Sequence, residues 1–251
     1  MKRLGIQVYT LREYLNTDES CAETLKKLRE MGCHTVQLCG GLEYMERCAK
    51  YCKENDLTII GTLVSLDPFE NDPEPLFDFC RRYGLKDIGF SSGIKSHEEA
   101  LDYIKRVNAF AQVACKEGFT VSYHNHSNEF IRTDCGKTVM DLLIEGFDAE
   151  KVNFMPDTYW VQHGGADVRH FLETIRGRAK ILHLKDMKRG ENGPTFAEVG
   201  QGNLWFEAII PLAEEIGVED FVIEQDICDG DPLDSVRMSC AWLQEKGLIE
   251  V

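Results

Sequence analysis

Paired cysteines, long apolar runs and basic charge are all scarce in this sequence. Its ten cysteines are scattered along 251 residues with no Cys-x-x-Cys spacing. The chain therefore has neither the ligand pairs of a zinc ribbon nor the dense framework of a small secreted domain. We expect most of the cysteines to be reduced, buried and packed as small apolar side chains.

Targeting and membrane signals are absent as well. The basic start at Met1–Arg3 is followed by no apolar stretch long enough for a secretion signal. No run approaches the roughly 18 apolar residues that a membrane helix needs. We therefore expect a soluble, cytoplasmic protein.

Basic residues are outnumbered, since 28 Lys and Arg stand against 43 Asp and Glu and the net charge is −15. A net negative charge repels nucleic acid and an anionic membrane surface, so we expect neither as a partner. A small substrate that is neutral or modestly charged fits this balance better. For the assembly, a homodimer is the commonest expectation.

The chain repeats one pattern eight times: a short β-branched run, a turn and an amphipathic helical stretch. The predicted strands are Leu4–Tyr9, Thr35–Leu38, Thr58–Ser65, Asp87–Ser91, Thr120–His124, Lys151–Asp157, Lys180–Lys185 and Phe221–Asp226. The predicted helices are Cys21–Met31, Leu42–Asn55, Glu74–Tyr83, His97–Lys116, Val139–Ile144, Val168–Ile175, Phe206–Ile216 and Ser235–Gln244.

This repetition indicates a parallel sheet with helices between its strands. No G-x-G-x-x-G motif follows the first strand, which argues against an open dinucleotide-binding sheet. Eight units in about 250 residues are typical of a closed barrel. We predict a single (β/α)8 TIM barrel domain over residues 1–251.

Polar residues follow the last four predicted strands at the end where barrel enzymes carry their sites. Because side chains alternate between the two faces of a strand, one residue or pair from each strand faces the barrel axis. These inward residues are His124, Asp157, His183 with Lys185, and Glu224. Histidine with carboxylates is a ligand set for Mn²⁺, Co²⁺, Zn²⁺ or Mg²⁺. The alternative is that each residue only caps the end of its strand through hydrogen bonds. The occurrence of such residues on four adjacent strands argues against this alternative.

Five segments carry a resemblance that covers essentially the whole chain. They resemble the sugar phosphate isomerase/epimerase group of the xylose isomerase-like barrel superfamily, which implies a barrel fold, a divalent metal and sugar chemistry. The segments are Ile6–Arg12, Tyr123–Phe130, Asp157–Trp160, His183–Asp186 and Val199–Gly202.

The resemblance also implies a ligand set with two departures. In the epimerase branch, Glu, Asp, His and Glu on strands five to eight hold the metal, and the two Glu move protons. Asp157 and Glu224 match this pattern, whereas His124 stands in the strand-five Glu position and Lys185 in the strand-seven His position. A mechanism with two glutamates therefore does not carry over intact. The His183–Asp186 segment is similar to the inosose dehydratase branch.

The chemistry shared by such enzymes is removal of a proton next to a carbonyl, which gives an enediolate that a metal stabilises. We predict that His124, Asp157 and Glu224 hold the metal, with His183 as a fourth ligand. Besides Glu224, Lys185 and Glu129 are the candidates for proton transfer. A nearby cation would lower the pKa of Lys185.

Both of these candidates have structural alternatives. Lys185 is alternatively an ion-pair partner of Asp186 or Glu224, and Glu129 alternatively orients His126.

The substrate is expected to meet polar and aromatic side chains near the strand ends. We assign this role to Gln7, Tyr9, Gln37, His126 and Trp160. For Trp160, and for Trp205 as a second stacking candidate, packing in the core is the alternative. The polar, glycine-rich segment Lys188–Asn203 suits a loop that folds over the substrate, with Lys188 and Arg189 near a phosphate.

Other functions remain open on the sequence alone. An apurinic endonuclease is disfavoured, because it needs a basic surface and more metal ligands than seven histidines and a charge of −15 provide. A dehydratase or lyase that acts on a 3-keto sugar or inosose begins with the same enolisation as an isomerase. A sugar-binding barrel without catalysis, or a subunit that acts only with an oxidoreductase partner, is the third alternative.

Overall fold

Eight parallel strands form the barrel of the computed structural model, which describes residues 3–249. Met1 and Lys2 of the basic start lie outside the described residues. The strands pair in the order β6-β5-β4-β3-β2-β1-β10-β7, and the bridges Phe154↔Ala179 and Asp157↔His183 close the circle between β6 and β7. The bounds are β1 Arg3–Gln7, β2 Thr35–Cys39, β3 Thr58–Val64, β4 Asp87–Ser91, β5 Thr120–His124, β6 Val152–Met155, β7 Ile181–Leu184 and β10 Asp220–Ile223. The predicted TIM barrel fold is confirmed.

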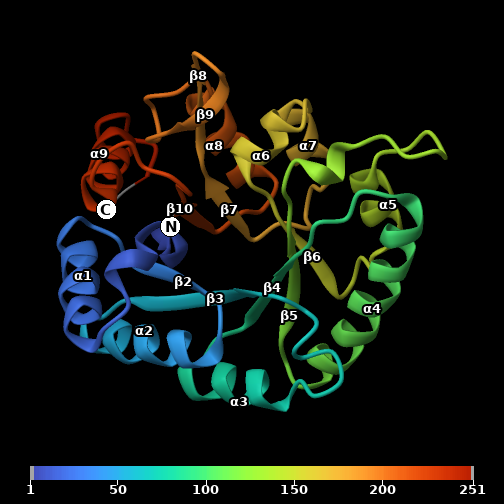
Figure 1. Cartoon of the computed structure of the whole chain (residues 1–251), viewed down its shortest axis with the longest axis horizontal. Helices are drawn as coiled ribbons and strands as arrows, with labels where there is room; N and C mark the ends of the chain where they lie inside the picture. The colour runs from blue at the N-terminus through green and yellow to red at the C-terminus, as the bar shows by residue number, and fades with distance from the viewer. Residues whose placement is uncertain (1–2, 250–251) are drawn as a thin grey trace.

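Helices surround the strands (Figure 1). Three of them begin at capping boxes, in which Thr17, Ser96 and Thr138 accept a hydrogen bond from a backbone N–H one turn into the helix. The helices are α1 Asp18–Glu30, α2 Leu42–Glu54, α3 Glu74–Tyr83, α4 His97–Lys116, α5 Val139–Gly146, α6 Thr158–His163, α7 Val168–Thr174, α8 Phe206–Glu215 and α9 Pro232–Glu245, with 3-10 turns η1 Val8–Tyr14 and η2 Asn128–Phe130.

The predicted strands extend too far at the mouth of the barrel. The first ends at Gln7, whose side chain accepts a hydrogen bond from the Tyr9 N–H at 3.3 Å and starts η1. The last ends at Ile223, and the N–H of Gln225 donates to the hydroxyl of Thr10 instead of to a strand. The helix α6 was not predicted. It begins directly after Asp157, so the end of β6 is shorter than expected.

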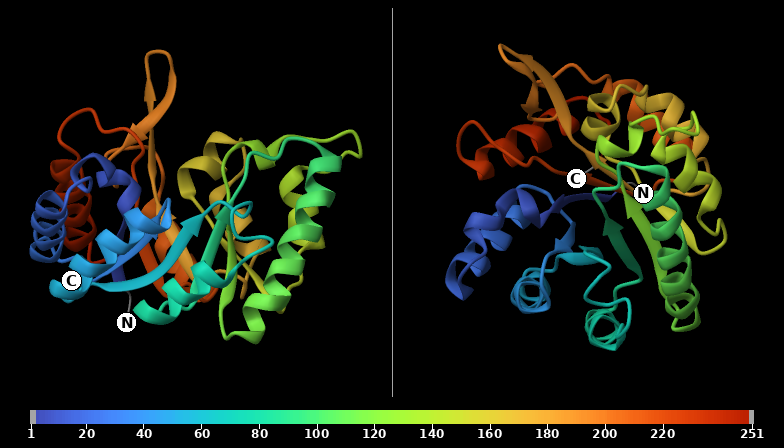
Figure 2. Two further views of the ribbon diagram at one scale, coloured as in Figure 1. Left: turned by 60° about the horizontal axis from the view of Figure 1, so that its bottom comes forward. Right: turned by 45° about the vertical axis from the view of Figure 1, so that its right-hand side comes forward.

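The segment after β7 is a hairpin where an irregular loop over Lys188–Asn203 was expected. Strands β8 Asp186–Gly190 and β9 Gly193–Ala197 pair antiparallel, and Gly193 at φ 135° allows the tight turn between them. The hairpin projects beyond the rest of the barrel (Figure 2). Its Phe196 ring lies 4.4 Å from the ring of Tyr159, which anchors it to α6.

The apolar core has two parts. Ile60, Met155, Ile181 and Val222 fill the inside of the barrel, and a larger layer lies between strands and helices. All ten cysteines are free and six of them are buried, as expected of small apolar side chains. Within residues 3–249 every helix is too short or too polar to cross a membrane.

Candidate metal centre

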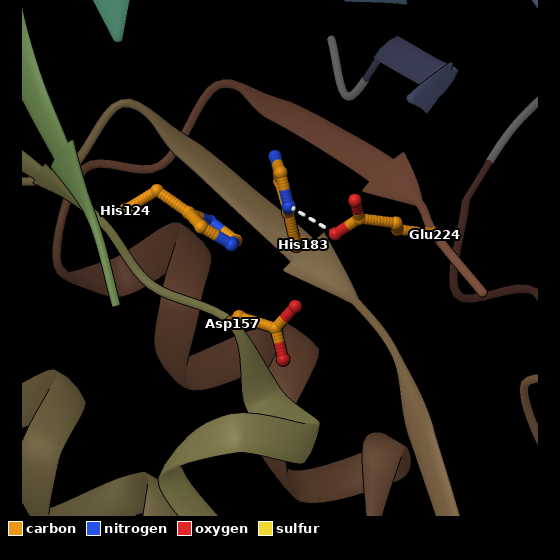
Figure 3. Close-up of side chains that lie close together, drawn as sticks. All are labelled: His124, Asp157, His183 and Glu224. Carbon is orange, nitrogen blue, oxygen red and sulfur yellow. Dashed lines mark hydrogen bonds and ion pairs between the residues drawn. The ribbon is translucent and has the colours of Figure 1, made fainter. Parts of the chain in front are cut away.

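The four predicted metal ligands meet at the carboxyl end of the barrel. His124 is the last residue of β5, Asp157 follows β6, His183 belongs to β7 and Glu224 follows β10. Each offers one ligand atom, and these atoms all lie within 4.8 Å of one another. Figure 3 shows the side chains converging from four separate segments of the chain. We call this group the four-donor cluster.

Hydrogen bonds from the barrel interior orient His183. Its Nε2 lies 2.7 Å from Oε1 of Gln37, and its Nδ1 lies 2.8 Å from Oε2 of Glu224. Gln7 donates to the same Gln37 oxygen at 2.8 Å, which leaves that oxygen as an acceptor for the histidine. With its proton on Nε2, Nδ1 carries a lone pair and cannot donate to the Glu224 carboxylate, so Nδ1 and Glu224 Oε2 are both left to bind a cation, the usual arrangement of a metal-binding histidine.

Two buried atoms of the cluster have no hydrogen bond in the described part of the chain, although one of them, Asp157 Oδ2, lies 3.4 Å from the ammonium of Lys185. His124 Nδ1 and Asp157 Oδ2 make no hydrogen bond within residues 3–249, although both side chains are buried. A buried polar atom without a partner costs about 1–3 kcal/mol. Two such atoms among four converging donors fit a divalent cation, which satisfies both. The remaining oxygen of Asp157, Oδ1, accepts the N–H of Trp160 at 2.9 Å and caps α6.

Charge at the centre follows from burial. Burial, and then His183 and His126, hold the pKa of His124 well below its usual range, so the imidazole is neutral and able to ligate. Burial raises the pKa of Asp157 to about 7. The ammonium of Lys185, 3.4 Å from Oδ2, offsets only part of this effect of burial on the Asp157 carboxylate.

Lys185 is buried beside the four-donor cluster. Its Nζ lies 2.7 Å from Asp226 Oδ1, 3.3 Å from Glu224 Oε2 and 3.4 Å from Asp157 Oδ2. Burial alone lowers the pKa of Lys185, but these carboxylates together raise it, so the ammonium form is favoured in the absence of a cation. The lowered pKa expected from the sequence requires the cation. Strand β7 thus brings both His183 and Lys185 to the site, and Asp226 is a partner that the sequence did not single out.

Glu129 lies behind the cluster and holds the loop after β5. Its carboxylate accepts the hydroxyl of Tyr123 at 2.6 Å and the N–H of His126 at 3.0 Å. Burial raises the pKa of Glu129 to about 7. Of the two roles considered for Glu129, these contacts favour positioning of His126.

A cavity of about 310 Å³ opens beside the cluster. Of the predicted substrate-binding residues, Tyr9 and His126 line it, together with the unpredicted Ser65 and Ser91. The prediction for Gln7 and Gln37 needs correction, because both are fully buried and bonded to each other. They position His183 and do not line this cavity. The remaining wall is formed by Cys39, Gly40, Leu63, Val64, His124, Lys185, Glu224 and Asp226.

The two predicted stacking tryptophans differ. The ring of Trp160 lies 5.5 Å from that of His126 and 5.3 Å from Lys185 Nζ, so it packs behind the site. Trp205 is 62% exposed in front of α8 and meets the guanidinium of Arg169. The core packing considered for Trp205 is therefore wrong, and its stacking role stays a prediction, with its ring against a surface arginine.

The carboxylate of Asp186 has a structural role at the base of the hairpin. Asp186 accepts backbone N–H groups from Met187, Gly200, Gly202 and Leu204 at 2.7–3.1 Å. This buried carboxylate ties the start of the hairpin to the glycine-rich turn that follows it. Lys188, predicted near a phosphate, forms an ion pair with Asp229 at 2.9 Å.

Fold and cluster together define the class: a parallel (β/α)8 barrel with a candidate metal centre at the carboxyl ends of its strands. Residues 25–246 match the family described as Xylose isomerase-like TIM barrel, and the chain belongs to this family.

The chain is similar to several known proteins. It is 22% identical over 171 residues to an inosose dehydratase of Clostridium perfringens, a match that covers 61% of this chain and 57% of the relative. A sugar phosphate isomerase/epimerase from Parabacteroides distasonis superposes with a TM-score of 0.86 at 22% identity, covering 99% of this chain and 96% of that one. A xylose isomerase-like barrel from Mycobacterium smegmatis, solved with magnesium, gives 0.74 at 14% identity over 98% and 96%. At these identities the structures show a shared fold.

Proposed function

We propose that the protein is a divalent-metal-dependent isomerase or epimerase that removes a proton next to the carbonyl of a sugar, sugar phosphate or keto-polyol. The observation that carries this proposal is the four-donor cluster, in which His124 Nδ1 and Asp157 Oδ2 have no hydrogen-bond partner within residues 3–249. His124, Asp157, His183 and Glu224 would hold the metal. Bound Mn²⁺, Co²⁺, Zn²⁺ or Mg²⁺ supplies Lewis-acid stabilisation to the oxygens of the enolised substrate.

Two groups of the cavity wall are suited to moving the proton. Burial favours a higher pKa for Glu224, but Lys185 and His183 outweigh it and hold that pKa well below its usual range. Glu224 is therefore an ionised base. The ammonium of Lys185, 3.3 Å away, is a proton donor and a positive charge for a developing oxyanion. Tyr9 and His126 line the cavity and are assigned to the substrate hydroxyls.

Dehydration is the second candidate, and one observation favours it. The Lys185 ammonium lies at the cavity wall, where it can protonate a hydroxyl that departs from the carbon beyond the enolised centre. The curated relatives are inosose dehydratases, although the match spans only about half of their length (57%). The two functions differ after enolisation: a dehydratase loses water, whereas an isomerase or epimerase returns a proton to the substrate.

The test is deuterium exchange on the whole chain. The protein is stripped with a chelator, reloaded with Mn²⁺, Co²⁺, Zn²⁺ or Mg²⁺ and incubated in D₂O with ketoses, ketose phosphates and keto-inositols. Metal-dependent deuterium at a carbon next to the carbonyl supports enolisation, and additional loss of water identifies a dehydratase. Sugar binding without exchange contradicts the proposal and favours a binding barrel.

Lys185 is tested by replacement with methionine. We expect Lys185→Met to lower the exchange rate by about 100-fold or more, the range for a general acid–base group. The matched control is Lys180→Met, since Lys180 is exposed and its Nζ contacts surface Glu219 at 2.8 Å and the Gly217 carbonyl at 3.4 Å. Full activity and an unchanged pH profile in Lys185→Met would refute its catalytic role.

A further inference from the structure

Arg12 ends the segment Ile6–Arg12, which carries part of the family resemblance, and has no role in the site described so far. It belongs to η1, the turn that directly follows β1. Its side chain lines a small cavity of about 170 Å³. Asp226 lines both this cavity and the one at the four-donor cluster. Arg12 therefore lies behind the wall of the candidate site.

The guanidinium of Arg12 holds Tyr9 in two ways. Its Cζ lies 4.3 Å from the centre of the Tyr9 ring, and its Nη1 donates to the Tyr9 carbonyl at 2.9 Å. Tyr9 is 42% exposed at the cavity wall, so much of its ring has no other contact to restrain it. A cation over the face of an exposed tyrosine favours that position of the ring by about 2- to 5-fold. Arg12 thus covers one face of the ring and leaves the remainder to the cavity.

The same guanidinium also holds the segment that follows β10. Its Nη2 donates to the Asp226 carbonyl at 3.1 Å, and next to it the N–H of Gln225 donates to the hydroxyl of Thr10 at 3.0 Å. Two hydrogen bonds with η1 therefore fix the backbone of this segment. The carboxylate of Asp226 lies 2.7 Å from Nζ of Lys185. The position of the Lys185 ammonium thus depends on a turn near the other end of the chain.

Arginine is suited to these contacts for a geometric reason. Its guanidinium carries several N–H donors in a rigid, planar fork, and the plane of the fork also stacks on aromatic rings. Two nitrogens of Arg12 reach carbonyls of different segments while the carbon between them lies over Tyr9. The ammonium of a lysine is a single point of charge and cannot make all three contacts together.

We propose that Arg12 is a positioning residue of the candidate site. It acts on substrate binding through Tyr9, whose ring it holds at the cavity wall. It acts on proton transfer through Asp226, which holds Lys185. The inference rests on the proposed function for what these residues do to a substrate, whereas the contacts of Arg12 do not depend on that function.

Amide hydrogen exchange tests the positioning without any substrate. Exchange is followed by mass spectrometry on the metal-free whole chain, in peptides that cover residues 224–230. Arg12→Met should accelerate exchange there by about tenfold or more, the size expected for loss of a hydrogen bond from a charged donor. Arg47→Met is the matched control, because Arg47 donates to the Leu15 carbonyl at 3.3 Å, at the end of η1. The control should leave exchange of these peptides unchanged.

Steady-state kinetics separate the two contacts. Metal-dependent exchange of carbon-bound hydrogen is measured with 2-keto-myo-inositol, D-fructose and D-fructose 6-phosphate. With a sugar that exchanges, Arg12→Met should raise KM about 2- to 5-fold through Tyr9 and lower kcat by about tenfold or more through Asp226. Arg12→Lys keeps a cation for the Tyr9 ring but not the fork, so it should recover KM and leave kcat low. A defect confined to folding would lower Tm and leave both constants of the folded protein unchanged.

A double-mutant cycle checks that Arg12 acts through Tyr9. Tyr9→Leu alone should raise KM, and addition of Arg12→Met should raise it no further. Additive rises in KM, or wild-type KM and kcat in Arg12→Met, overturn the inference and leave the proposed function intact.

The amide measurement separates failure of this inference from failure of the proposed function. If no sugar exchanges carbon-bound hydrogen, the proposed function fails. Faster amide exchange at residues 224–230 in Arg12→Met, but not in Arg47→Met, then still supports the positioning role. Unchanged amide exchange in Arg12→Met overturns that role in every case.

Discussion

Replacement of Asp157 by asparagine should make the metal-free protein more stable and abolish its response to metal. Asparagine keeps an oxygen for the 2.9 Å hydrogen bond from the N–H of Trp160, so the cap of α6 survives. It removes the buried negative charge whose second oxygen, Oδ2, has no hydrogen bond within the described chain. Lys185 keeps Glu224 and Asp226 as partners.

The magnitude follows from the pKa of Asp157, which burial raises from 3.8 to about 7. A raised carboxyl pKa means that ionisation opposes folding: the cost is absent below pH 3.8, grows as the pH rises to 7 and is complete above it. The difference corresponds to about 4 kcal/mol at pH 8. The side-chain amide nitrogen of the new asparagine would lack a good hydrogen-bond partner, which costs about 1–3 kcal/mol and offsets part of this stabilisation. We expect a net stabilisation of about 2 kcal/mol, or a rise in Tm of about 4–8 °C for a chain of this size.

The assay is thermal unfolding at pH 8, with chelator and with Mn²⁺ in large excess. Wild-type protein should gain about 2.7 kcal/mol at a metal concentration 100 times Kd, whereas Asp157→Asn should gain little. Asp167→Asn is the matched control, since Asp167 caps α7 by accepting the N–H of His170 at 2.8 Å but is exposed. A metal-free Asp157→Asn that melts below wild type, or that keeps the full metal response, would refute this account of the centre.

Two further predictions concern the supports of the site. Burial raises the pKa of Glu129 from 4.5 to about 7, so its ionisation costs stability increasingly over that interval. The Tm of Glu129→Gln relative to wild type should therefore rise between pH 5 and pH 8. A difference in Tm that stays constant with pH would contradict the raised pKa of Glu129. In Gly200→Ala the new methyl group would overlap the ring of Trp242 at a φ of +86°, which should cost about 3 kcal/mol or more in denaturant unfolding. Gly165→Ala, at φ +85° with open space around it, should cost only about 1 kcal/mol, and equal losses would show that packing on Trp242 is unimportant.

The convergence of the four candidate ligands could be predicted because it depends on local patterns. Alternation along single strands placed His124, Asp157, His183 and Glu224 toward the barrel axis, and the rule that sites lie at the carboxyl ends of parallel strands placed them at one mouth. Both rules need only the order of residues within a strand. They hold even where the ends of the strands were predicted one to three residues too long.

Contacts between distant segments could not be predicted in the same way. Gln37 lies 146 residues from His183 in the sequence, and their 2.7 Å hydrogen bond exists only because closure of the barrel places β2 and β7 around the same axis. The hairpin after β7 was mistaken for a loop because its glycines are equally typical of both. Its identity rests on the register of β8 with β9 and on Phe196 against Tyr159.

The amino-acid sequence by itself determined the eightfold strand and helix repeat, the barrel that follows from it and the donor residues at the ends of the last four strands, because periodicity is a property of neighbouring residues. Tertiary structure decided which buried atoms have partners. The unsatisfied atoms of His124 and Asp157, and the three carboxylates around Lys185, arise from strands and loops that meet only when the sheet closes. Burial then sets their charge, since desolvation depends on the surroundings in space and not on the neighbours along the chain.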